Sequence, residues 1–464
     1  MDKISANKTE IWKKYYRLNN YYHLEYQHSI RNIIPIDASV LEFSCRGGEL
    51  LKSLPNKSKV GVEFDDGLVK YANKKLSKVP ILLFNKPLKL PAIKRFDYII
   101  FSHTSSDIDD LQGLIKQIKR FCDEDTRVVV SYFNFFWRPL HSLIEKVGLK
   151  HPSFKEPNWL TEGDVDNFFY LEDFEKIKSI KKVLIPYKIP LISDLVNRYI
   201  APFPLINYLC FNNYSIYRLK PKIKDYSVSV VIPARNEAGN MPGVIKKIPN
   251  MSRFTEVIFV EGHSKDKTYE AIQEEIEKYN GPYKIFLFKQ KGKGKGDAVR
   301  LGFSKAKNEL LMILDADLTV EPKELPKFYD AVAQGKGNLV MGSRLVYPME
   351  DQAMRDLNYL GNKFFSWAFS YLLGQKIKDT LCGTKVITKT HYKKIEKNRK
   401  VFGDFDPFGD YDLIFGAARL NLKITEVPIR YKERTYGTTN ISRFKHGLLL
   451  FKMLFFAARK IKFV

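Results

Sequence analysis

Two series of short apolar runs, separated by a proline-rich stretch, constrain what this chain can fold into. The first series consists of Val40–Phe43, Lys59–Phe64, Phe96–Ser102 and Arg127–Phe133, with helix-like segments such as Asp109–Phe121 between them. The second consists of Val228–Pro233, Glu256–Glu261, Tyr283–Phe288, Glu309–Asp315 and Asn338–Ser343. Strands that alternate with helices predict βαβ units on a parallel sheet, here twice. The predicted fold class is α/β with two domains.

The length of the chain and the stretch between the two series support this division. At 464 residues the chain is too long for one compact core. Residues 183–225 contain five prolines, and Tyr199–Tyr217 within them has no charged side chain. We expect residues 1–182 to form the first domain, residues 183–225 a linker or covering segment, and residues 226–464 the second domain. The covering segment would face the other domain or a membrane.

The charge of the chain favours an anionic partner. Lys and Arg number 77 against 52 Asp and Glu, which gives a net charge of +25. Nucleic acid, an anionic membrane surface and phosphorylated substrates are the candidate partners. Nine basic residues lie between Arg430 and Val464, eight of them flanking the apolar run Gly447–Ala458 and one, Lys452, inside it. The run is shorter than the ~20 residues of a spanning helix. This basic amphipathic tail is expected either to lie on a membrane or to pack as a core helix.

Composition and cysteine usage indicate a folded cytoplasmic protein. The chain is 44% hydrophobic and 28% charged, which is ordinary for globular domains. Its four cysteines show neither paired nor metal-binding spacing, so we expect reduced, buried thiols. The first ten residues are polar and do not form a signal peptide.

Polar residues follow each strand of the second series, and ligands of open α/β sheets bind at the carboxyl ends of strands. The loop Lys291–Asp297 alternates lysine with glycine, which suits a diphosphate. Asp315 and Asp317 follow an apolar strand and could hold a hard divalent cation. A D-x-D pattern alone often occurs by chance on surface turns, but here it comes fourth in an ordered series of such loops.

Taken in order, these motifs resemble the family 2 glycosyltransferases of GT-A fold, and most closely the dolichyl- or polyprenyl-phosphate mannose and glucose synthases. The resemblance runs from about Ser227 to the C-terminus and includes VIPARNE, EVIFVEGHSKDKT, GKGDAVRLGF, LMILDADL, MGSR, DTLCGTKV and ITEVPIRY. It implies a GT-A nucleotide-sugar-binding sheet, a UDP- or GDP-sugar donor, Mg or Mn, and inversion at the sugar carbon.

The resemblance also implies roles for individual residues. Asp315 and Asp317 would bind the metal, and Arg344 and Arg355 would meet the acceptor phosphate. The donor would be bound by Pro233, Ala234, Asn236, Glu237, Glu261, Lys295, Asp315, Ala316 and Asp317. Asp317 and Arg344 would be catalytic, and a phosphate nucleophile would need no general base. Asp406 and Asp410 would orient an acceptor, serve as base for a hydroxyl, or have a structural role.

Departures from the group's pattern leave the acceptor open. Gly262-His263 follow Glu261 where a second acid and a glycine are usual, Thr319 replaces a glutamine, and the closing motif is Gly437–Asn440. The apolar stretch Phe364–Leu373 and the basic tail favour a lipid-linked phosphate, and a surface-glycan precursor is the other candidate acceptor. Both place the enzyme at the inner face of a membrane.

The first series resembles the class I S-adenosylmethionine-dependent methyltransferases and implies a Rossmann-like sheet. VLEFSCRGGELL and VGVEFDDGLVKYA carry the resemblance, with Glu42, Gly47, Gly48 and Glu63 as the implied cofactor-binding residues. Ser44 and Arg46 stand where glycines are usual, and an arginine is unfavourable beside a cationic sulfonium. S-adenosylmethionine is therefore a candidate cofactor, and a degenerate scaffold domain is the alternative.

Three functions follow from the sequence. The leading one is sugar transfer from a nucleotide sugar to a lipid-linked or glycan acceptor. The second is a bifunctional enzyme that also methylates the glycan or its carrier. The third, of another class, is a basic nucleic-acid-binding or scaffold protein; no recognised nucleic-acid motif supports it, and we expect no nucleic-acid partner.

Overall fold

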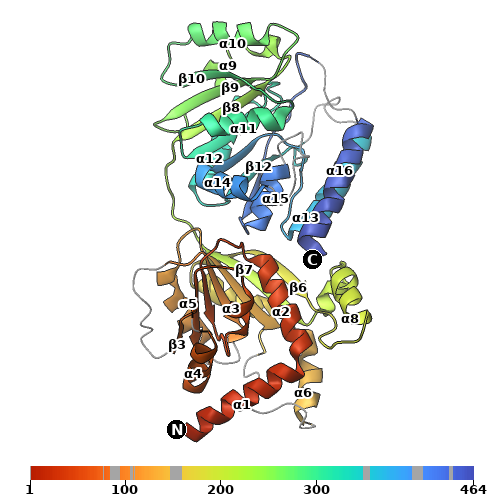
Figure 1. Ribbon diagram of the computed structural model, residues 1–464. Helices are drawn as coiled ribbons and strands as arrows, with labels where there is room; N and C mark the ends of the chain where they lie inside the picture. The colour runs from red at the N-terminus through yellow and green to blue at the C-terminus, as the bar shows by residue number, and fades with distance from the viewer. Residues whose placement is uncertain are drawn as a thin grey trace. The chain divides into compact units, whose positions relative to one another are not determined.

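The computed structural model divides into two compact units (Figure 1). It describes residues 2–76, 78–83, 95–104, 108, 110–146, 159–347, 356–399, 411–437 and 443–463. The first unit comprises Met1–Lys220 with Phe463–Val464, and the second comprises Pro221–Lys462. The described residues of each unit form one seven-stranded sheet with helices on both faces. The predicted fold class, α/β with two domains, is confirmed.

The first sheet has the strand order β3-β2-β1-β4-β5-β7-β6. Its strands are β1 (Val40–Phe43), β2 (Lys59–Glu63), β3 (Ile81–Leu83), β4 (Tyr98–Ser102), β5 (Arg127–Phe133), β6 (Phe174–Lys182) and β7 (Asn212–Leu219). The first five are parallel, as expected for the four of them that the sequence predicts, β1, β2, β4 and β5. β7 runs antiparallel to both of its neighbours, so the sheet is mixed.

The position of β7 differs from the sequence-based division of the chain. Residues 183–225 were expected to be a linker or covering segment, but Asn212–Leu219 within them form an interior strand between β5 and β6. An interior strand is covered on both faces, and seven of its eight residues are buried. The uncharged character of Tyr199–Tyr217 therefore has two causes, a core strand and the segment that precedes it.

Two layers of helices cover the first sheet. One layer contacts Val40, Tyr98 and Ile100, and the other contacts Leu41, Phe43 and Ile99 on the opposite face. The first layer comprises α2 (Asn20–Ile33), α3 (Glu49–Ser53) and α4 (Asp66–Lys75), and the second comprises α5 (Leu111–Ile118) and α7 (Glu162–Leu171). The other helices of this unit are α1 (Asp2–Leu18), α6 (Arg138–Lys146) and α8 (Ile192–Leu195).

The second sheet has the order β10-β9-β8-β11-β13-β12-β14. Its strands are β8 (Val228–Ala234), β9 (Thr255–Glu261), β10 (Lys284–Lys289), β11 (Leu310–Ile313), β12 (Leu339–Ser343), β13 (Lys385–Thr388) and β14 (Ile424–Pro428). Only β13 among them is antiparallel to its neighbours. All five strands predicted for this half are present within a residue or two of their expected bounds.

Helices also cover both faces of the second sheet. One face carries α9 (Val244–Lys247), α10 (Thr268–Glu277) and α12 (Leu325–Ala333). The other carries α11 (Lys295–Lys305), α13 (Asp356–Leu373), α14 (Lys389–Asn398), α15 (Tyr411–Arg419) and α16 (Arg443–Ala457). Within the described part of the chain, no helix combines the length and apolarity needed to span a membrane.

The C-terminal helix α16 combines the two alternatives left open for it. Leu450, Met453 and Ala457 are buried in the core beside α13, which Figure 1 shows lying next to α16. Leu448 and Phe455 are more than 60% exposed on the same helix. The helix is thus partly a core helix, and its remaining side presents apolar groups to the surroundings.

Candidate active site

The loops after the parallel strands of the second sheet meet at one edge, as predicted. Ala234 at the end of β8 pairs with Glu261 at the end of β9, which pairs in turn with Lys289 at the end of β10. β11 lies on the other side of β8, and its extension donates from the Leu314 amide to the Val231 carbonyl. The strand register therefore brings the Asn236, Glu261, Lys295 and Asp315 loops to the same edge of the sheet.

Asp315 forms an ion pair with Lys295 at the first turn of α11, with Nζ 2.7 Å from Oδ1. A Cβ atom on Gly383 would lie 1.9 Å from the Asp315 carboxylate, so only glycine fits at that position beside the pair. Burial acts to raise the pKa of Asp315, but the Lys295 ammonium outweighs it and leaves the pKa below its usual value. The carboxylate is therefore ionised at neutral pH.

Asp317 is joined to Glu237 through Arg434. The Arg434 guanidinium donates from Nη2 to Asp317 Oδ2 at 2.7 Å and from Nη1 to Glu237 Oε1 at 3.0 Å. Thr319 donates to the other Asp317 oxygen from its hydroxyl at 2.8 Å. Burial raises the pKa of Glu237, against the opposing effect of Arg434. Two carboxylates from different strand ends thus face one positive charge.

This donor set fits a divalent cation. Asp315 and Asp317 supply carboxylate oxygens, and the guanidinium held between Asp317 and Glu237 shows that a cation is favourable at this point. Over the described ranges, no group of three or more His, Cys, Asp or Glu lies together as a metal cluster. Asp315 and Asp317 would therefore hold a cation together with ligands from outside the protein, as Mg²⁺ commonly does with water and substrate phosphates.

The loops after β8 and β9 hold each other in place. Asn236 has a φ of +56° and accepts from the Lys265 amide at 2.7 Å, and Glu261 accepts from the Ser264 amide at 2.6 Å. Ala234 and Ala316 are buried in the core, so these two predicted donor-binding residues can offer a ligand only backbone groups. Pro233 at the end of β8 is half-buried.

A strap formed by Lys432–Gly437 lies over the same edge. The Lys432 amide donates to the Thr319 carbonyl at 3.0 Å, and the Tyr436 hydroxyl donates to Asp266 at 3.4 Å. The Tyr436 ring lies against Gly239, where a Cβ would come within 2.3 Å of it. The strap carries Arg434 to the two carboxylates, so the end of the chain contributes to the site.

Arg344 is fixed by Asp379 rather than free. Its guanidinium donates from Nε and Nη2 to the two Asp379 oxygens, at 2.7 and 2.9 Å, and Asp379 is fully buried. This carboxylate raises the pKa of Arg344 against the opposing effect of burial. Within the described ranges three buried hydroxyls near this pair lack a hydrogen-bond partner, those of Ser343, Thr380 and Thr384. Arg355, Asp406 and Asp410 lie outside the described residues.

The candidate cofactor residues of the first unit are all buried. Glu42 accepts from the Ser102 hydroxyl at 2.6 Å, and burial raises its pKa to about 8. Glu63 is 1% exposed and accepts from the amides of Arg46 and Phe64, at 2.7 and 2.8 Å. Gly47 and Gly48 are buried in the loop between them.

S-adenosylmethionine does not fit this loop as it stands. A ribose needs a carboxylate that is open to its hydroxyls, whereas Glu63 is 1% exposed and each of its oxygens already accepts from an amide of the protein. The Arg46 guanidinium lies over the Trp12 ring at 5.7 Å and keeps a positive charge beside the loop. His103 packs against Phe133 and is hydrogen-bonded to Tyr22, and burial lowers its pKa to about 3, which indicates a packing role.

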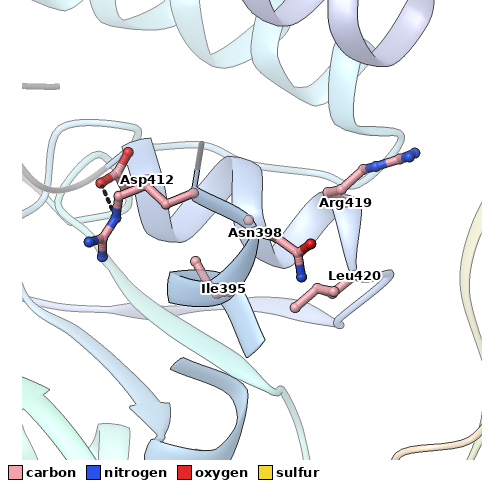
Figure 2. A pocket seen from close by; sticks show the side chains of 7 residues that line it. Ile395, Asn398, Asp412, Arg419 and Leu420 are labelled. Carbon is pink, nitrogen blue, oxygen red and sulfur yellow. Dashed lines mark ion pairs between the residues drawn. The ribbon is translucent and has the colours of Figure 1, made fainter. Parts of the chain in front are cut away.

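Figure 2 shows a hollow of the second unit that is separate from the predicted donor residues. Asp412 pairs there with Arg399 at 3.1 Å and with Arg300 at 3.7 Å, so its charge is neutralised. The side chain of Arg419 points away from Asp412 in this view. The hollow is lined by Ile395, Asn398, Arg399, Asp412, Gly416, Arg419 and Leu420. No residue expected to bind donor, acceptor or cofactor lines it.

The sequence did not single out Arg434, Asp379 or Gly383. Arg434 was counted only among the nine basic residues of the tail. Asp379 and Gly383 lie in the motif DTLCGTKV. An acidic residue close to a glycine was the only feature of this motif that could have pointed to a site. Their partners come from distant segments, and spacing alone does not pair Asp379 with Arg344 or Gly383 with Asp315.

Comparison with known proteins agrees with both resemblances. The family model of glycosyl transferase family 2 matches residues 229–400, and that of a methyltransferase domain matches residues 19–178. Dolichyl-phosphate beta-glucosyltransferase ALG5A of Trichomonas vaginalis is 30% identical over 255 residues, which cover 50% of this chain and 70% of that protein. Glycosyltransferase AglJ of Haloferax volcanii is 28% identical over 235 residues, or 50% of this chain and 72% of that protein.

Among solved structures, a SAM-dependent methyltransferase of Thermotoga maritima, a possible histamine N-methyltransferase, is similar to the first half. It is 16% identical and has a TM-score of 0.36, over 47% of this chain and 98% of that one.

Proposed function

The second half of this chain belongs to glycosyltransferase family 2, and from this premise we propose that it transfers a hexose, with inversion, from a UDP- or GDP-sugar to a lipid-linked phosphate or surface-glycan precursor. The observation that carries the proposal is the meeting of Asp315, Asp317, Lys295 and Glu237 at one sheet edge. A nucleotide sugar presents to such an edge a base and ribose, a diphosphate, and a sugar.

The diphosphate would be bound between the two aspartates and the first turn of α11. Lys295 and the helix N-terminus supply positive charge on one side. A bound Mg or Mn would supply Lewis-acid stabilisation of the departing nucleoside diphosphate. Asp317 and Asp315 would hold that ion, and Asn236, Glu237 and Glu261 would line the nucleoside side of the pocket.

The acceptor would approach from the Arg344 side. Arg344 keeps donors that its bonds to Asp379 do not use, and the unpartnered hydroxyls of Ser343, Thr380 and Thr384 lie in the same part of the chain. A phosphate acceptor is already anionic at neutral pH, so the protein's work is positioning. Arg355 remains the second residue proposed to meet it, and Asp410 the proposed base for a hydroxyl acceptor.

A lipid-linked acceptor would place the enzyme at the inner face of a membrane. Leu448, Phe451 and Phe455 on α16 are exposed. The ring centroid of Phe364 on α13 lies 5.8 Å from that of Phe451. Basic residues follow directly in Arg459–Lys462. An exposed apolar face beside basic side chains suits peripheral binding to an anionic surface.

The proposal is tested by calorimetric titration of the full chain with UDP and with GDP, each with and without Mn²⁺. Metal-dependent binding of one nucleotide is the expected result, followed by sugar transfer to a polyprenyl phosphate. Absence of binding by either nucleotide in the presence of metal would refute the donor site.

A second function, methyl transfer by the first unit, is favoured by the match of residues 19–178 to a methyltransferase domain. The closed loop around Glu63 instead favours a degenerate domain. Titration with S-adenosylmethionine separates the two, because binding requires the buried Glu63 carboxylate to become accessible to the ribose. We expect no binding by the wild-type chain, and saturable binding would establish a bifunctional enzyme.

A further inference from the structure

The segment Tyr187–Leu209, between β6 and β7, has polar side chains inside and apolar side chains outside; we name it the lobe. Ser193 is fully buried and Asn197 is 5% exposed, whereas Leu191 is 87% and Leu205 81% exposed. Further large side chains of the lobe are also exposed, including Leu195, Tyr199, Phe203 and Tyr208. This is the reverse of the usual arrangement in water, and an apolar surface of this extent indicates an interaction site.

The buried polar groups of the lobe bond to backbone groups of the lobe and of the residues just before it. Asn197 Oδ1 accepts from the amides of Leu184 and Ile185, at 2.8 and 2.9 Å. The Ser193 hydroxyl donates to the Tyr187 carbonyl at 2.7 Å and accepts from the Ile189 amide at 2.9 Å. Four prolines in residues 186–204 remove further amide donors. Backbone groups that enter lipid must be satisfied internally, and the Ser193 hydroxyl does this for the Tyr187 carbonyl and the Ile189 amide.

Two strained turns turn leucines outward. Leu191 has φ 64° and ψ −36°, and Leu205 has φ 69° and ψ −49°. Positive φ is unfavourable for a branched side chain, and each leucine directly follows a proline. Both turns nevertheless expose a leucine side chain almost completely to solvent. This arrangement is unfavourable unless a binding partner covers the side chain.

The lobe is fastened to the first sheet. Asn134, just beyond β5, donates to the carbonyls of Tyr208 and Cys210, at 2.7 and 2.9 Å. Trp137 Nε1 donates to the Leu209 carbonyl at 2.9 Å. Figure 1 shows α8 projecting to the side of this sheet beside β6. These hydrogen bonds hold the lobe, with its exposed leucines, against the body of the first unit.

The charged residues in and beside the lobe indicate what kind of partner it binds. Its single acid, Asp194, is neutralised by Lys188 at 2.5 Å, whereas Arg198 has an aromatic neighbour instead, the Tyr199 ring at 5.5 Å. Lys181 lies over the exposed Tyr208 ring at 3.9 Å. Exposed tyrosines flanked by cations are typical of segments at the headgroup level of a bilayer. The lobe's Ser193 and Asn197 face inward, so its outward side chains are mainly apolar groups and tyrosines.

We propose that the lobe inserts into the headgroup region of an anionic lipid bilayer and anchors the first unit to the membrane surface. The leucines enter the apolar layer and the tyrosines and basic side chains remain at its boundary. The anchor belongs to the first unit, where the Phe203 ring of the lobe packs against the Phe463 ring with centroids 6.0 Å apart. It does not depend on the sugar-transfer reaction.

The test is flotation of the full chain with phosphatidylcholine vesicles that contain phosphatidylserine, and with vesicles of phosphatidylcholine alone. The wild type is expected to float with the anionic vesicles, and Leu191→Glu/Leu205→Glu to bind them at least ~10-fold more weakly. The matched control is Leu171→Glu/Ile223→Glu, two exposed apolar positions outside the lobe, which should bind as the wild type does. Leu448→Glu/Phe455→Glu measures the separate contribution of α16.

Two further measurements keep the outcome clear. Leu205→Cys carrying an environment-sensitive dye should shift its emission to the blue on anionic vesicles, since the described cysteines are buried and will not compete for label. UDP or GDP binding by the lobe variant should equal that of the wild type, so that failure of the anchor is distinguishable from failure of the donor site. Wild-type affinity in the lobe variant, or no wild-type binding to anionic vesicles, would overturn the proposal. So would conversion of a wild-type dimer to a monomer by the same substitutions, because a second copy would then cover the lobe.

Discussion

Asp317 is the residue on which the proposed sugar transfer depends most. It stands at a strand end with the Arg434 guanidinium beside it, and its loss would remove both a proposed metal ligand and a partner of Arg434. Asp317→Ala is expected to lower metal-dependent turnover by about 10²–10³-fold, the usual cost of losing one electrostatic contact to the departing group. Asp330→Ala, an exposed aspartate on α12, is the matched control. Normal metal-dependent turnover by Asp317→Ala would remove this residue from the mechanism.

Arg434 donates to Asp317, one of the two carboxylates proposed to hold a metal ion. Two cations near one carboxylate repel each other, so Arg434 competes with Mn²⁺ as long as no nucleotide is bound. Arg434→Ala is expected to bind Mn²⁺ about 10-fold more tightly in the absence of nucleotide. The concentration of free Mn²⁺, followed by electron paramagnetic resonance, reports this affinity. Equal or weaker binding by the variant would contradict the competition.

Glu42 makes the stability of the first unit depend on pH. Its pKa is raised from 4.5 to about 8 by burial, so between these values the native carboxyl keeps a proton that the unfolded chain releases. The free energy of unfolding therefore falls as pH rises through this window, and the contribution is fully present only below pH 4.5. Glu42→Gln keeps an acceptor for Ser102 and is expected to gain about 2–4 kcal/mol at pH 8 over the wild type.

Thermal unfolding of the wild type and Glu42→Gln at pH 5 and pH 8 measures this effect. The advantage of the variant should be small at the lower pH and large at the higher. Glu10→Gln changes an exposed glutamate in the same unit and should alter neither curve. A pH-independent difference between wild type and Glu42→Gln would show that the carboxyl is ionised throughout.

At the scale of elements, the contact between α11 and β8 positions Lys295. A Cβ on Gly302 of α11 would lie 2.3 Å from Val231 Cγ1 of β8, a branched side chain that cannot move aside. Gly302→Ala is therefore expected to lower the free energy of unfolding by about 1–3 kcal/mol. Gly361→Ala on α13 meets nothing within 4 Å and should be neutral or stabilise by about 0.5–1 kcal/mol, because alanine favours helix. Urea unfolding compares the two, and equal effects would contradict the close contact.

Strands β1, β2, β4, β5 and β8 to β12 could be predicted because their apolar runs are bounded by polar turns, whereas β3 and β6 were not among the predicted runs. β7 could not, since Asn212–Leu219 has the asparagines and the single arginine of a loop, and only its pairing with β5 and β6 buries them. β13 and β14 were missed for a similar reason: Lys385–Thr388 and Ile424–Pro428 are too short to show a period. The outward leucines of the lobe follow no period either, because their direction is set by the two strained turns.

The sequence could predict those residues of the candidate site that lie in the loops directly after the strands. Asp315 and Lys295 meet because β10 and β11, with β9 and β8 between them, are parallel and end at one edge of the sheet, which the βαβ pattern already implies. Arg434 reaches Asp317 from 117 residues away, and Asp379 reaches Arg344 from 35 residues away through a loop without a periodic pattern. The closing of Glu63 by the Arg46 amide depends on backbone direction, to which side-chain identity gives no guide.

At the scale of the whole molecule, the two units are expected to unfold separately, because each has its own cores and sheet. Differential scanning calorimetry should then resolve two transitions. Mn²⁺ with the bound nucleotide at 100 times its dissociation constant stabilises only the unit that binds it, by about 2.7 kcal/mol, and so should raise only the second unit's transition. Glu42→Gln at pH 8 should raise only the first, which identifies the transitions independently. A single transition that moves with both changes would mean that the units fold as one body, and vesicle binding through the lobe would then be linked energetically to donor binding.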